Sequence, residues 1–283
     1  MNELAGRTAL VTGASGGVVP HIVDALAGEG MNLALSALSE EELRPTVARA
    51  ESIGVRTVAS AGDVTRMEDL NRLVETAERE FGGVDVLING AGIEFTYVYH
   101  KLDLEDISRA MTINLVAPML LSRLLLPEMV RRGRGHIVCI SSVAAKFASP
   151  YSEPYAASKA GLIAFTKSLR STYRDLGISA TSIIAGFIEA GMYTRVKEQG
   201  IKVNPLVGSS PPEKVASAVL RGIKRDKAEI YVNPRAPMLQ ATAALGEFVP
   251  SIHEISAKAT GSTEMARKWA LLHERERAER AVR

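Results

Sequence analysis

Short apolar runs alternate along the chain with longer segments in which apolar residues recur every three or four positions. Almost continuously apolar runs are typical of strands buried on both faces of a sheet, and the longer spacing is typical of helices. The predicted strands are Arg7–Thr12, Met31–Ser36, Val55–Ser60, Val84–Asn89, His136–Ser141, Ile178–Ile184 and Glu229–Val232. The predicted helices include Val18–Gly28, Glu41–Ile53, Arg66–Phe81, Leu104–Arg132, Glu153–Leu176 and Pro212–Ile223. This alternation predicts a doubly wound α/β fold with a mostly parallel sheet and right-handed crossovers.

The alternation of strands and helices stops at about Pro234. Beyond it, Leu239, Ala243, Phe248 and Ile252 are spaced like the apolar stripe of a helix, and charges of both signs alternate from residue 274 to 280. We therefore predict one α/β domain over residues 1–233 and a helical extension over residues 234–283. The extension packs on its own domain or on a partner subunit; a helix lying on a membrane surface is the alternative.

Composition and charge narrow the class of protein. The 283 residues are 46% hydrophobic and 23% charged, as in a soluble globular protein, and a formal net charge of +2 gives no argument for a nucleic-acid partner. The single cysteine, Cys139, excludes an internal disulfide and is expected to be a buried thiol. The longest apolar run, Leu115 to Leu126, is interrupted by Pro118 and Arg123. These features, and an N-terminus without the pattern of a signal peptide, lead us to expect a cytoplasmic protein with no integral membrane segment. The five histidines show no metal-ligand spacing, so we also expect no metal site.

The first predicted strand ends in a glycine-rich loop with the sequence TGASGGVVP, residues 12–20. Open parallel sheets bind ligands beyond the carboxyl ends of their strands. Gly13, Gly16 and Gly17 would let the backbone turn tightly and bring N–H groups to a pyrophosphate at the start of a helix. Glycine clusters also form plain turns, but the position between a first strand and a helix favours a phosphate site.

Tyr155 and Lys159 are four residues apart in a predicted helix, which places both side chains on one face. A nearby ammonium group favours phenolate, so Lys159 is expected to lower the pKa of Tyr155 from its ordinary value near ~10. Tyr155 would then exchange protons in the interconversion of a carbonyl and an alcohol. An isolated pair of this kind is often only a surface tyrosine beside a surface lysine.

The order and spacing of several motifs decide between these readings. The glycine loop, Asp63, the segment 89–92 (NGAG), Asn114, Ser142 and the Tyr155–Lys159 pair follow one another in the chain. In this order they resemble the short-chain dehydrogenase/reductase family, over residues 3–233. The resemblance implies a seven-stranded Rossmann sheet with helices on both faces, a nicotinamide dinucleotide cofactor, a small-molecule substrate, and a homodimer or homotetramer.

The resemblance also assigns roles to residues. Tyr155 would be the catalytic acid or base, and Lys159 would lower its pKa and hold the nicotinamide ribose. Ser142 would bind the substrate oxygen, with Ser141 beside it structural, and Asn114 would hold a water that links Lys159 to solvent. The cofactor would contact Gly13, Ser15, Gly16, Gly17, Val18, Ala37, Leu38, Asp63, Val64, Asn89, Gly90, Ala91, Tyr155, Lys159, Gly186 and Ile188. The substrate would contact candidates among Glu94, Phe95, Ala144, Lys146, Phe147, Glu153, Phe187 and Met192.

The chain departs from the family pattern at several positions. Val19 replaces the glycine that allows close packing of helix on strand, so it is expected to push the helix outward or to be absorbed by smaller neighbours. Pro20 follows it, in the first helical turn, where a missing N–H costs little. Ala190 replaces a threonine beside the nicotinamide. No acidic residue directly follows the second strand, where Leu38 stands, which favours NADP over NAD.

These features leave two hypotheses for function. The first is an NAD(P)-dependent oxidoreductase that interconverts a ketone or aldehyde with an alcohol on a small substrate. Phe147, Phe187 and Met192 predict an apolar substrate cavity, although the same side chains also suit core or lid packing. The alternative, motivated by the departures, is a cofactor-binding sensor or scaffold with weak or no turnover.

Overall fold

Seven parallel strands form one sheet, in the order β3-β2-β1-β4-β5-β6-β9. The computed structural model describes residues 1, 3–147, 149–201 and 207–282. The strands of this sheet are β1 (Thr8–Thr12), β2 (Asn32–Ala37), β3 (Thr57–Ala61), β4 (Val86–Asn89), β5 (Gly135–Ser142), β6 (Ile178–Ala185) and β9 (Glu229–Val232). The predicted doubly wound, seven-stranded fold is therefore confirmed. Two further strands, β7 (Phe187–Ile188) and β8 (Ser209–Ser210), pair with each other outside the sheet.

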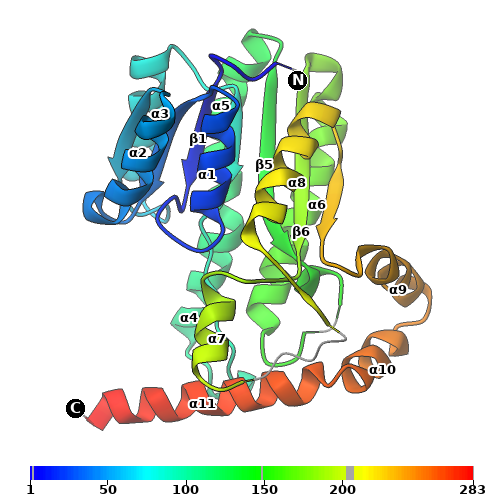
Figure 1. Cartoon of the computed structure of the whole chain (residues 1–283). Coiled ribbons are helices and arrows are strands. Elements are labelled where there is room, and N and C mark those ends of the chain that lie inside the picture. The colour runs from blue at the N-terminus through cyan, green and yellow to red at the C-terminus, as the bar shows by residue number, and fades with distance from the viewer. Residues whose placement is uncertain (2, 148, 202–206, 283) are drawn as a thin grey trace.

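Helices cover both faces of the sheet (Figure 1). One face carries α1 (Val19–Gly28), α2 (Glu40–Ile53) and α8 (Pro212–Arg225), which share one apolar core. The other face carries α3 (Met67–Phe81), α5 (Ala117–Arg131) and α6 (Glu153–Tyr173), which share the second. α4 (Leu104–Met111) precedes α5, and α7 (Met192–Glu198) follows β7.

The two cores explain why the strands are apolar at nearly every position. Successive side chains of a strand point to opposite faces. In β1, Ala9 and Val11 therefore pack in the first core while Leu10 packs in the second, and in β2 Leu33 and Ala34 divide in the same way. A sheet covered on both faces has no polar side, so the alternation expected of a half-exposed strand is missing.

The helix predicted over Leu104–Arg132 is α4 and α5 joined by a π-helical turn, Thr112–Val116. Pro118 stands at the start of α5 and has no N–H to donate to the turn before it. Within the described residues, Leu104–Arg131 is the one helical stretch long and apolar enough to cross a membrane by length and composition, with a mean hydropathy of 1.5. In this fold 44% of its most apolar 18 residues are buried, and Leu121 and Leu125 lie in the second core.

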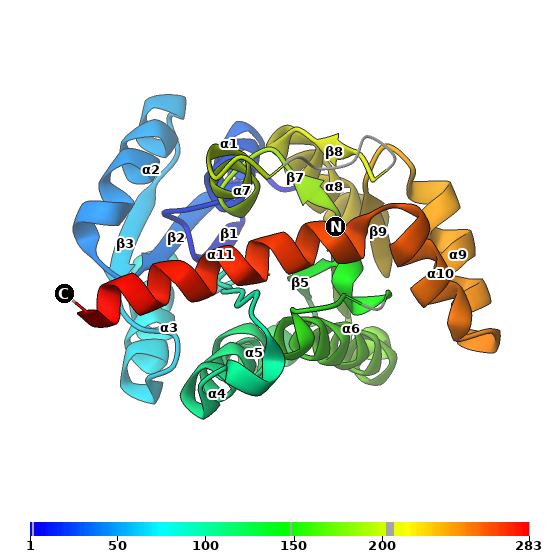
Figure 2. The ribbon, with the colours of Figure 1, turned by 90° about the horizontal axis from the view of Figure 1, so that it is seen from below.

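Three helices follow β9: α9 (Ala236–Phe248), α10 (Ser251–Ala259) and α11 (Ser262–Val282). Ala243 is buried, but Phe248 is 84% exposed, so the apolar stripe predicted for this segment is wrong at Phe248. Figure 1 shows α11 running beneath the carboxyl ends of the strands, and Figure 2 shows it crossing the middle of that face. The division into parts at residues 233 and 234 stays a prediction.

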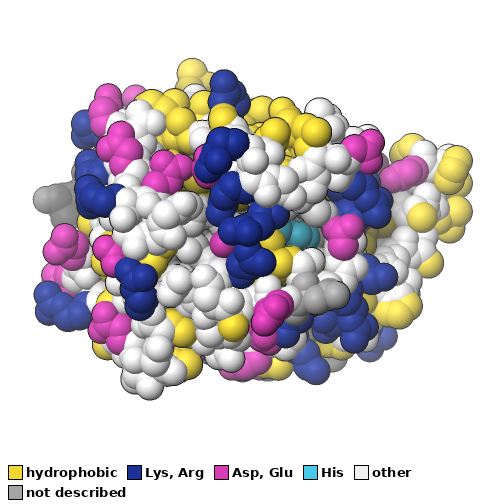
Figure 3. Space-filling model, turned by 90° about the horizontal axis from the view of Figure 1, so that it is seen from above, with side chains coloured by type: hydrophobic (Ala, Val, Ile, Leu, Met, Phe, Trp, Pro, Cys, Tyr) yellow, Lys and Arg dark blue, Asp and Glu magenta, His cyan; other side chains and the backbone are white. Residues whose placement is uncertain are grey.

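The opposite end of the molecule carries the amino ends of the strands. Seen from this end, Lys and Arg side chains are interspersed with Asp and Glu (Figure 3). Asp85, just before β4, pairs at 3.0 Å with Arg132 and at 2.9 Å with Arg134. These pairs connect the end of α5 to the start of β4 and β5, so we assign the charged residues here a structural role.

Candidate active site

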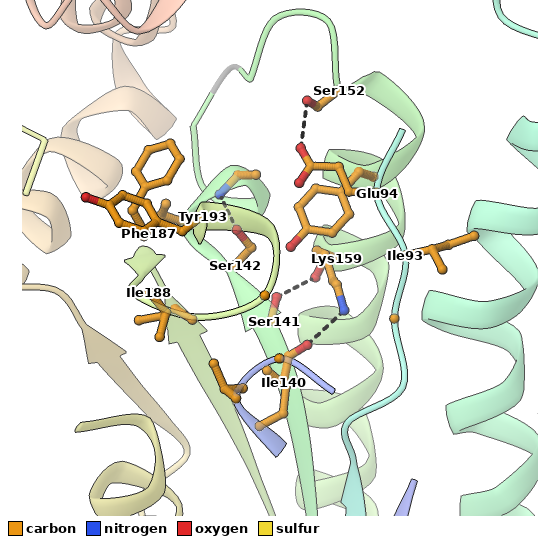
Figure 4. Close-up of a pocket in the computed structure, with 18 of the residues that line it drawn as sticks. Ile93, Glu94, Ile140, Ser141, Ser142, Ser152, Lys159, Phe187, Ile188 and Tyr193 are labelled. Atoms are coloured by element: carbon orange, nitrogen blue, oxygen red, sulfur yellow. Dashed lines mark hydrogen bonds between the residues drawn. The ribbon is translucent and has the colours of Figure 1, made fainter. Parts of the chain in front are cut away.

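One cavity of about 820 Å³ opens at the carboxyl ends of the strands. Its wall runs without a break from the glycine loop after β1, past the ends of β4 and β5, to the C-terminal helices. Figure 4 shows the part of it in which β5, α6 and the segment after β4 converge. The topology therefore brings together side chains that lie far apart in the sequence.

The glycine loop suits a pyrophosphate because its glycines adopt positive φ values and leave no side chain between the backbone N–H groups and a ligand. Gly13 has a φ of +70°, and a Cβ there would lie 2.8 Å from Ala91. Gly17 has a φ of +60°, and a Cβ on Gly191 would lie 2.9 Å from the Gly17 Cα. Among the described residues, no protein acceptor takes the amides of Gly17 and Val18, which line the cavity at the start of α1. These are the donors that an anionic dinucleotide requires.

The unusual Val19 is absorbed by a neighbouring glycine. Its side chain is 3% exposed, and a Cβ added to Gly90 would lie 2.8 Å from Val19 Cγ2. Gly90, at the end of β4, thus supplies the room that the missing glycine of the loop would have supplied. Of the two outcomes expected from the sequence, absorption by a smaller neighbour is confirmed, and α1 keeps its place against the sheet.

The far end of the cavity is lined by residues after β2 and β3. Leu38 is 68% exposed and borders this end together with Ala37, Asp63 and Val64. Glu42, in the first turn of α2, also borders it, and its Oε2 accepts a 3.2 Å hydrogen bond from Ser15 Oγ. The sequence showed no acidic residue directly after β2, but the fold brings a carboxylate to that place from four residues further along.

Asn114 lies in the π-helical turn and is fully buried. Its Oδ1 accepts from the Ile93 N–H at 2.9 Å, and its Nδ2 donates to the Ile93 carbonyl at 2.8 Å and to Ser158 Oγ at 3.1 Å. π-helical turns often occur at functional sites because they redirect a side chain. Asn114 thereby fixes the segment after β4, and a Cβ on Gly92 would lie 3.2 Å from both its Oδ1 and Lys159 Nζ.

Tyr155 and Lys159 lie on one face of α6, as predicted, and point into the cavity beside β5. Lys159 is buried, its Nζ donates to the Ile140 carbonyl at 2.9 Å (Figure 4), and it lies 5.7 Å from the centre of the Tyr155 ring. Because β5 ends beside this helix, the phenol and the ammonium are held by main-chain geometry rather than by flexible loops.

Burial controls the protonation of both groups. Burial, with the nearby Glu94 carboxylate second, raises the pKa of Tyr155, while the adjacent Ser142 hydroxyl opposes the shift. Burial also lowers the pKa of Lys159 to about 8. The sequence-based expectation that the pKa of Tyr155 is lowered is therefore wrong for this structure, because burial is the largest influence on the phenol and disfavours phenolate.

The two serines at the end of β5 make different hydrogen bonds. Ser142, at the end of β5, lines the cavity, and its Oγ accepts from the Ala144 N–H at 3.2 Å. Ser141 is buried, and its Oγ donates to the Lys159 carbonyl at 3.0 Å, so it ties β5 to α6. Both serines border the cavity, but the Ser141 hydroxyl is committed to the Lys159 carbonyl and so positions the helix that carries Tyr155.

Glu94 extends the polar part of the cavity beyond Tyr155. Its Oε1 accepts from Ser152 Oγ at 3.0 Å (Figure 4) and from Thr96 Oγ1 at 3.1 Å. Thr96 and Ser152 are both buried. Two buried hydroxyls thus orient one oxygen of the carboxylate, and its charge acts on the Tyr155 phenol.

Most of the predicted site residues line this cavity. Those that do are Gly13, Ser15, Gly16, Gly17, Val18, Ala37, Leu38, Asp63, Val64, Gly90, Ala91, Glu94, Ser142, Ala144, Phe147, Tyr155, Lys159, Gly186, Phe187 and Ile188. The Met192 side chain lies outside what the structure describes. Lys146 turns away to Glu229, at 3.3 Å, and Phe95 and Glu153 also lie outside the lining.

Asn89 is a further correction. It is the last residue of β4, and its amide donates at 3.6 Å to the sulfur of Cys139, the buried thiol expected from the sequence. The side chain therefore points between β4 and β5 rather than into the main cavity. The cofactor contact that the family resemblance assigned to Asn89 is available instead at the next residues, Gly90 and Ala91, which do line the cavity.

Sequence reasoning missed the wall that the C-terminal helices supply. Met238 and Leu239 of α9, His253 of α10, and Met265 and Trp269 of α11 all line the cavity. The ring of Phe147 meets that of His253 edge-on at 5.6 Å. Apolar periodicity marked this segment as helical, but periodicity alone does not say which surface a helix covers.

Comparison with known proteins agrees with this geometry. A family model described as short chain dehydrogenase matches residues 7–200. A ketoacyl reductase, HetN, from Nostoc sp. is 35% identical over 255 residues, which are 89% of this chain and 88% of that protein. A 3-oxoacyl-[acyl-carrier-protein] reductase from Synechocystis sp. is 30% identical over 234 residues, 82% of this chain and 94% of that protein.

A solved structure supports the fold. The crystal structure of levodione reductase superposes with a TM-score of 0.76 and 23% sequence identity, over 82% of this chain and 98% of that one. At this identity the likeness concerns the fold alone.

Proposed function

We propose a ketone-reducing function from one premise: this chain belongs to the short-chain dehydrogenase/reductase family and is an NAD(P)-dependent oxidoreductase. The proposed substrate is a small ketone with an apolar body, interconverted with its secondary alcohol. The observation that supports it is the convergence of Ser142, Tyr155 and Lys159 in one cavity that also contains the glycine loop and the apolar side chains of Phe147 and Phe187.

When bound, the nicotinamide cofactor would supply a hydride to the carbonyl carbon and be oxidised as the ketone is reduced. Tyr155 would give its phenolic proton to the carbonyl oxygen, and its raised pKa keeps that proton on the phenol until it is needed. Ser142 would donate a hydrogen bond to the same oxygen and stabilise its developing charge. Lys159, held at the Ile140 carbonyl, would bind the ribose hydroxyls and return a proton to the phenol.

The sequence-based preference for NADP over NAD stays a proposal, and two features bear on it in opposite directions. The neutral, exposed Leu38 leaves the place after β2 without an acid. Glu42, bonded to Ser15, puts a carboxylate at the same end of the cavity, where it would repel a 2′-phosphate. Titration with NADH and NADPH measures which of these two features decides the cofactor preference.

Reduction is the direction we propose because the two relatives described above are named as a ketoacyl reductase and a 3-oxoacyl-[acyl-carrier-protein] reductase. The alternative role as a sensor or scaffold rests on four departures from the family pattern: Val19, Pro20, Leu38 and Ala190. Val19 is accommodated by Gly90, and Pro20 stands in the first turn of α1, so the two loop residues do not favour that role. Leu38 and Ala190 leave it as the second candidate, which the cofactor titration below tests. A homodimer or homotetramer and a cytoplasmic location stay predictions.

The test is turnover with a matched variant. Purified protein is titrated with NADH and NADPH, and oxidation of the bound form is then followed at the nicotinamide absorbance band with a panel of small ketones. Tyr155→Phe should bind cofactor as the wild type does and lose about a thousandfold or more in turnover. Full activity in Tyr155→Phe would rule out the mechanism, and failure of the wild type to bind either cofactor would rule out the function.

A further inference from the structure

The helix α11 crosses the face of the sheet at which the cavity opens (Figure 2). It meets the segment before α4 on one side of the cavity and the region that follows α7 on the other. Its inward residues Met265, Ala266 and Trp269 line the cavity, while Trp269 is only 8% exposed. The chain thus covers its own site with a segment that follows the α/β domain.

Ion pairs attach α11 to the wall next to α4. Lys101 Nζ lies 3.0 Å from Glu274 Oε2. Arg277 pairs with Asp103, and also with Asp106 at 3.6 Å. Each such partly exposed pair adds little to stability by itself, but together these pairs hold the same stretch of α11 against the wall next to α4.

Contacts on the opposite wall complete the crossing. Gln199 donates to Glu276 at 3.0 Å, just after α7 ends. Ile201 and Trp269 form a small buried cluster, with Met265 packed against it. Because both walls are engaged, α11 bridges the cavity instead of lying along one edge.

A partly buried chain of hydrogen bonds links α11 to the catalytic end. Trp269 Nε1 donates to His273 Nε2 at 2.9 Å, and His273 Nδ1 lies 3.0 Å from the Thr96 carbonyl oxygen. Since Nε2 accepts, Nδ1 carries the proton and donates. Thr96 in turn donates to Glu94, beside Tyr155. The position of α11 is therefore coupled to the wall nearest the reacting atoms.

We propose that α11 determines substrate class by admitting free ketones that fit wholly beneath it and excluding ketones tethered to a carrier protein. This rests on the proposed reductase function. A tethered acyl group must keep one end outside the enzyme while its carbonyl lies at Tyr155, so the tether has to pass the covered mouth. A free ketone with an apolar body can instead lie wholly inside the cavity and pack against Met265 and Trp269. The chain would thus differ in substrate from relatives named as acyl-carrier-protein reductases.

The experiment compares one reacting group in two forms. Ethyl 3-oxobutanoate and the 3-oxobutanoyl group carried on an acyl-carrier protein present the same ketone, free and tethered. Both are assayed with the full chain and with Glu274→Gln/Arg277→Gln, which releases α11 from the α4 wall. The matched control is Glu264→Gln/Arg267→Gln, whose pair at 3.9 Å lies within α11 itself.

The wild type should prefer the free ester by about 100-fold in kcat/KM. The release variant should narrow this ratio about tenfold, mainly by gaining activity on the tethered group, and the control should keep the wild-type ratio. Equal or better use of the tethered group by the wild type would overturn the proposal, as would an unchanged ratio in the release variant. If all three proteins bind cofactor yet reduce neither form, the proposed function fails, and this inference fails with it.

Discussion

Val19 and Gly90 are complementary: the valine occupies the space that the glycine leaves by having no side chain. A Cβ on Gly90 would lie 2.8 Å from Val19 Cγ2 and 2.7 Å from the Thr12 carbonyl oxygen. Close packing between α1 and the sheet is therefore preserved, but the glycine that allows it stands after β4 and not in α1. An unusual residue in a cofactor loop does not by itself mark a degenerate site.

Restoring a small residue at position 19 should damage the protein. Val19→Ala removes two buried methyl groups next to Gly90 and leaves a cavity, so we expect a loss of about 2 kcal/mol in the free energy of unfolding. Cofactor affinity should stay within about threefold, because the amides of Gly17 and Val18 are untouched. Urea unfolding and cofactor titration measure the two quantities. A gain in stability would contradict the complementarity of Val19 and Gly90.

Removing the Glu42 charge should favour NADPH. Glu42→Gln eliminates repulsion of a 2′-phosphate, so the ratio of the NADPH and NADH dissociation constants should move toward NADPH by about five- to tenfold. Glu41→Gln, on the same helical turn but outside the cavity lining, is the control and should leave the ratio unchanged. Equal shifts of this ratio in the two variants would show that it responds to the net charge of the protein and not to the position of Glu42.

Glu94→Gln should shift the pH dependence of reduction. Glu94 raises the pKa of Tyr155, so its neutral replacement lets that pKa fall. Reduction requires the protonated phenol, and activity should therefore begin to decline at lower pH than in the wild type. Profiles of kcat/KM against pH measure this. Glu153→Gln removes a nearby exposed carboxylate outside the cavity lining and should leave the profile in place.

Lys159 should make stability depend on pH. Its pKa is about 8 in the folded chain and ordinarily 10.5, so the unfolded chain binds its proton more readily between these values. The buried group therefore costs stability at neutral pH, up to about 3 kcal/mol, and this cost is relieved as pH rises from about 8 to 10.5. The unfolding free energy of wild type minus that of Lys159→Met should thus rise across that window.

The control for this prediction is Lys167→Met on the same helix. Hydrogen bonding to Glu229 raises the pKa of Lys167. The difference in unfolding free energy between the wild type and Lys167→Met should therefore not rise between pH 8 and 10.5. A flat difference curve for Lys159→Met would mean that the folded chain does not lower the pKa of Lys159.

The parts of the fold that were predictable from the sequence are those set by local pattern. β1 and β2 carry apolar side chains on both faces, and the helices between the strands show the longer apolar spacing, so the strand–helix order could be read directly. The π-helical turn around Asn114 could not be read, because apolar periodicity continues through it from α4 into α5. Asn89 was misplaced for a related reason: a motif gives the order of residues, while strand pleating decides which of them points into the cavity.

The rest of the site depends on contacts between distant segments. Glu42 reaches the cavity through the packing of α2, and a rule that looks only directly after β2 misses it. Trp269 and Met265 are more than a hundred residues beyond Tyr155, and their spacing fits a core helix, a surface helix or a lid equally well. Only the path of α11 across the sheet assigns them to the site.

That path also has a consequence for biosynthesis. α11 is translated after every strand of the sheet, and domains begin to fold from the N-terminal side while synthesis continues. The sheet, the glycine loop and the Tyr155–Lys159 pair can be in place on the ribosome before Trp269 has been made. The nascent protein would then pass through an interval with an assembled catalytic centre and an open pocket, and translation of the last helix would end it.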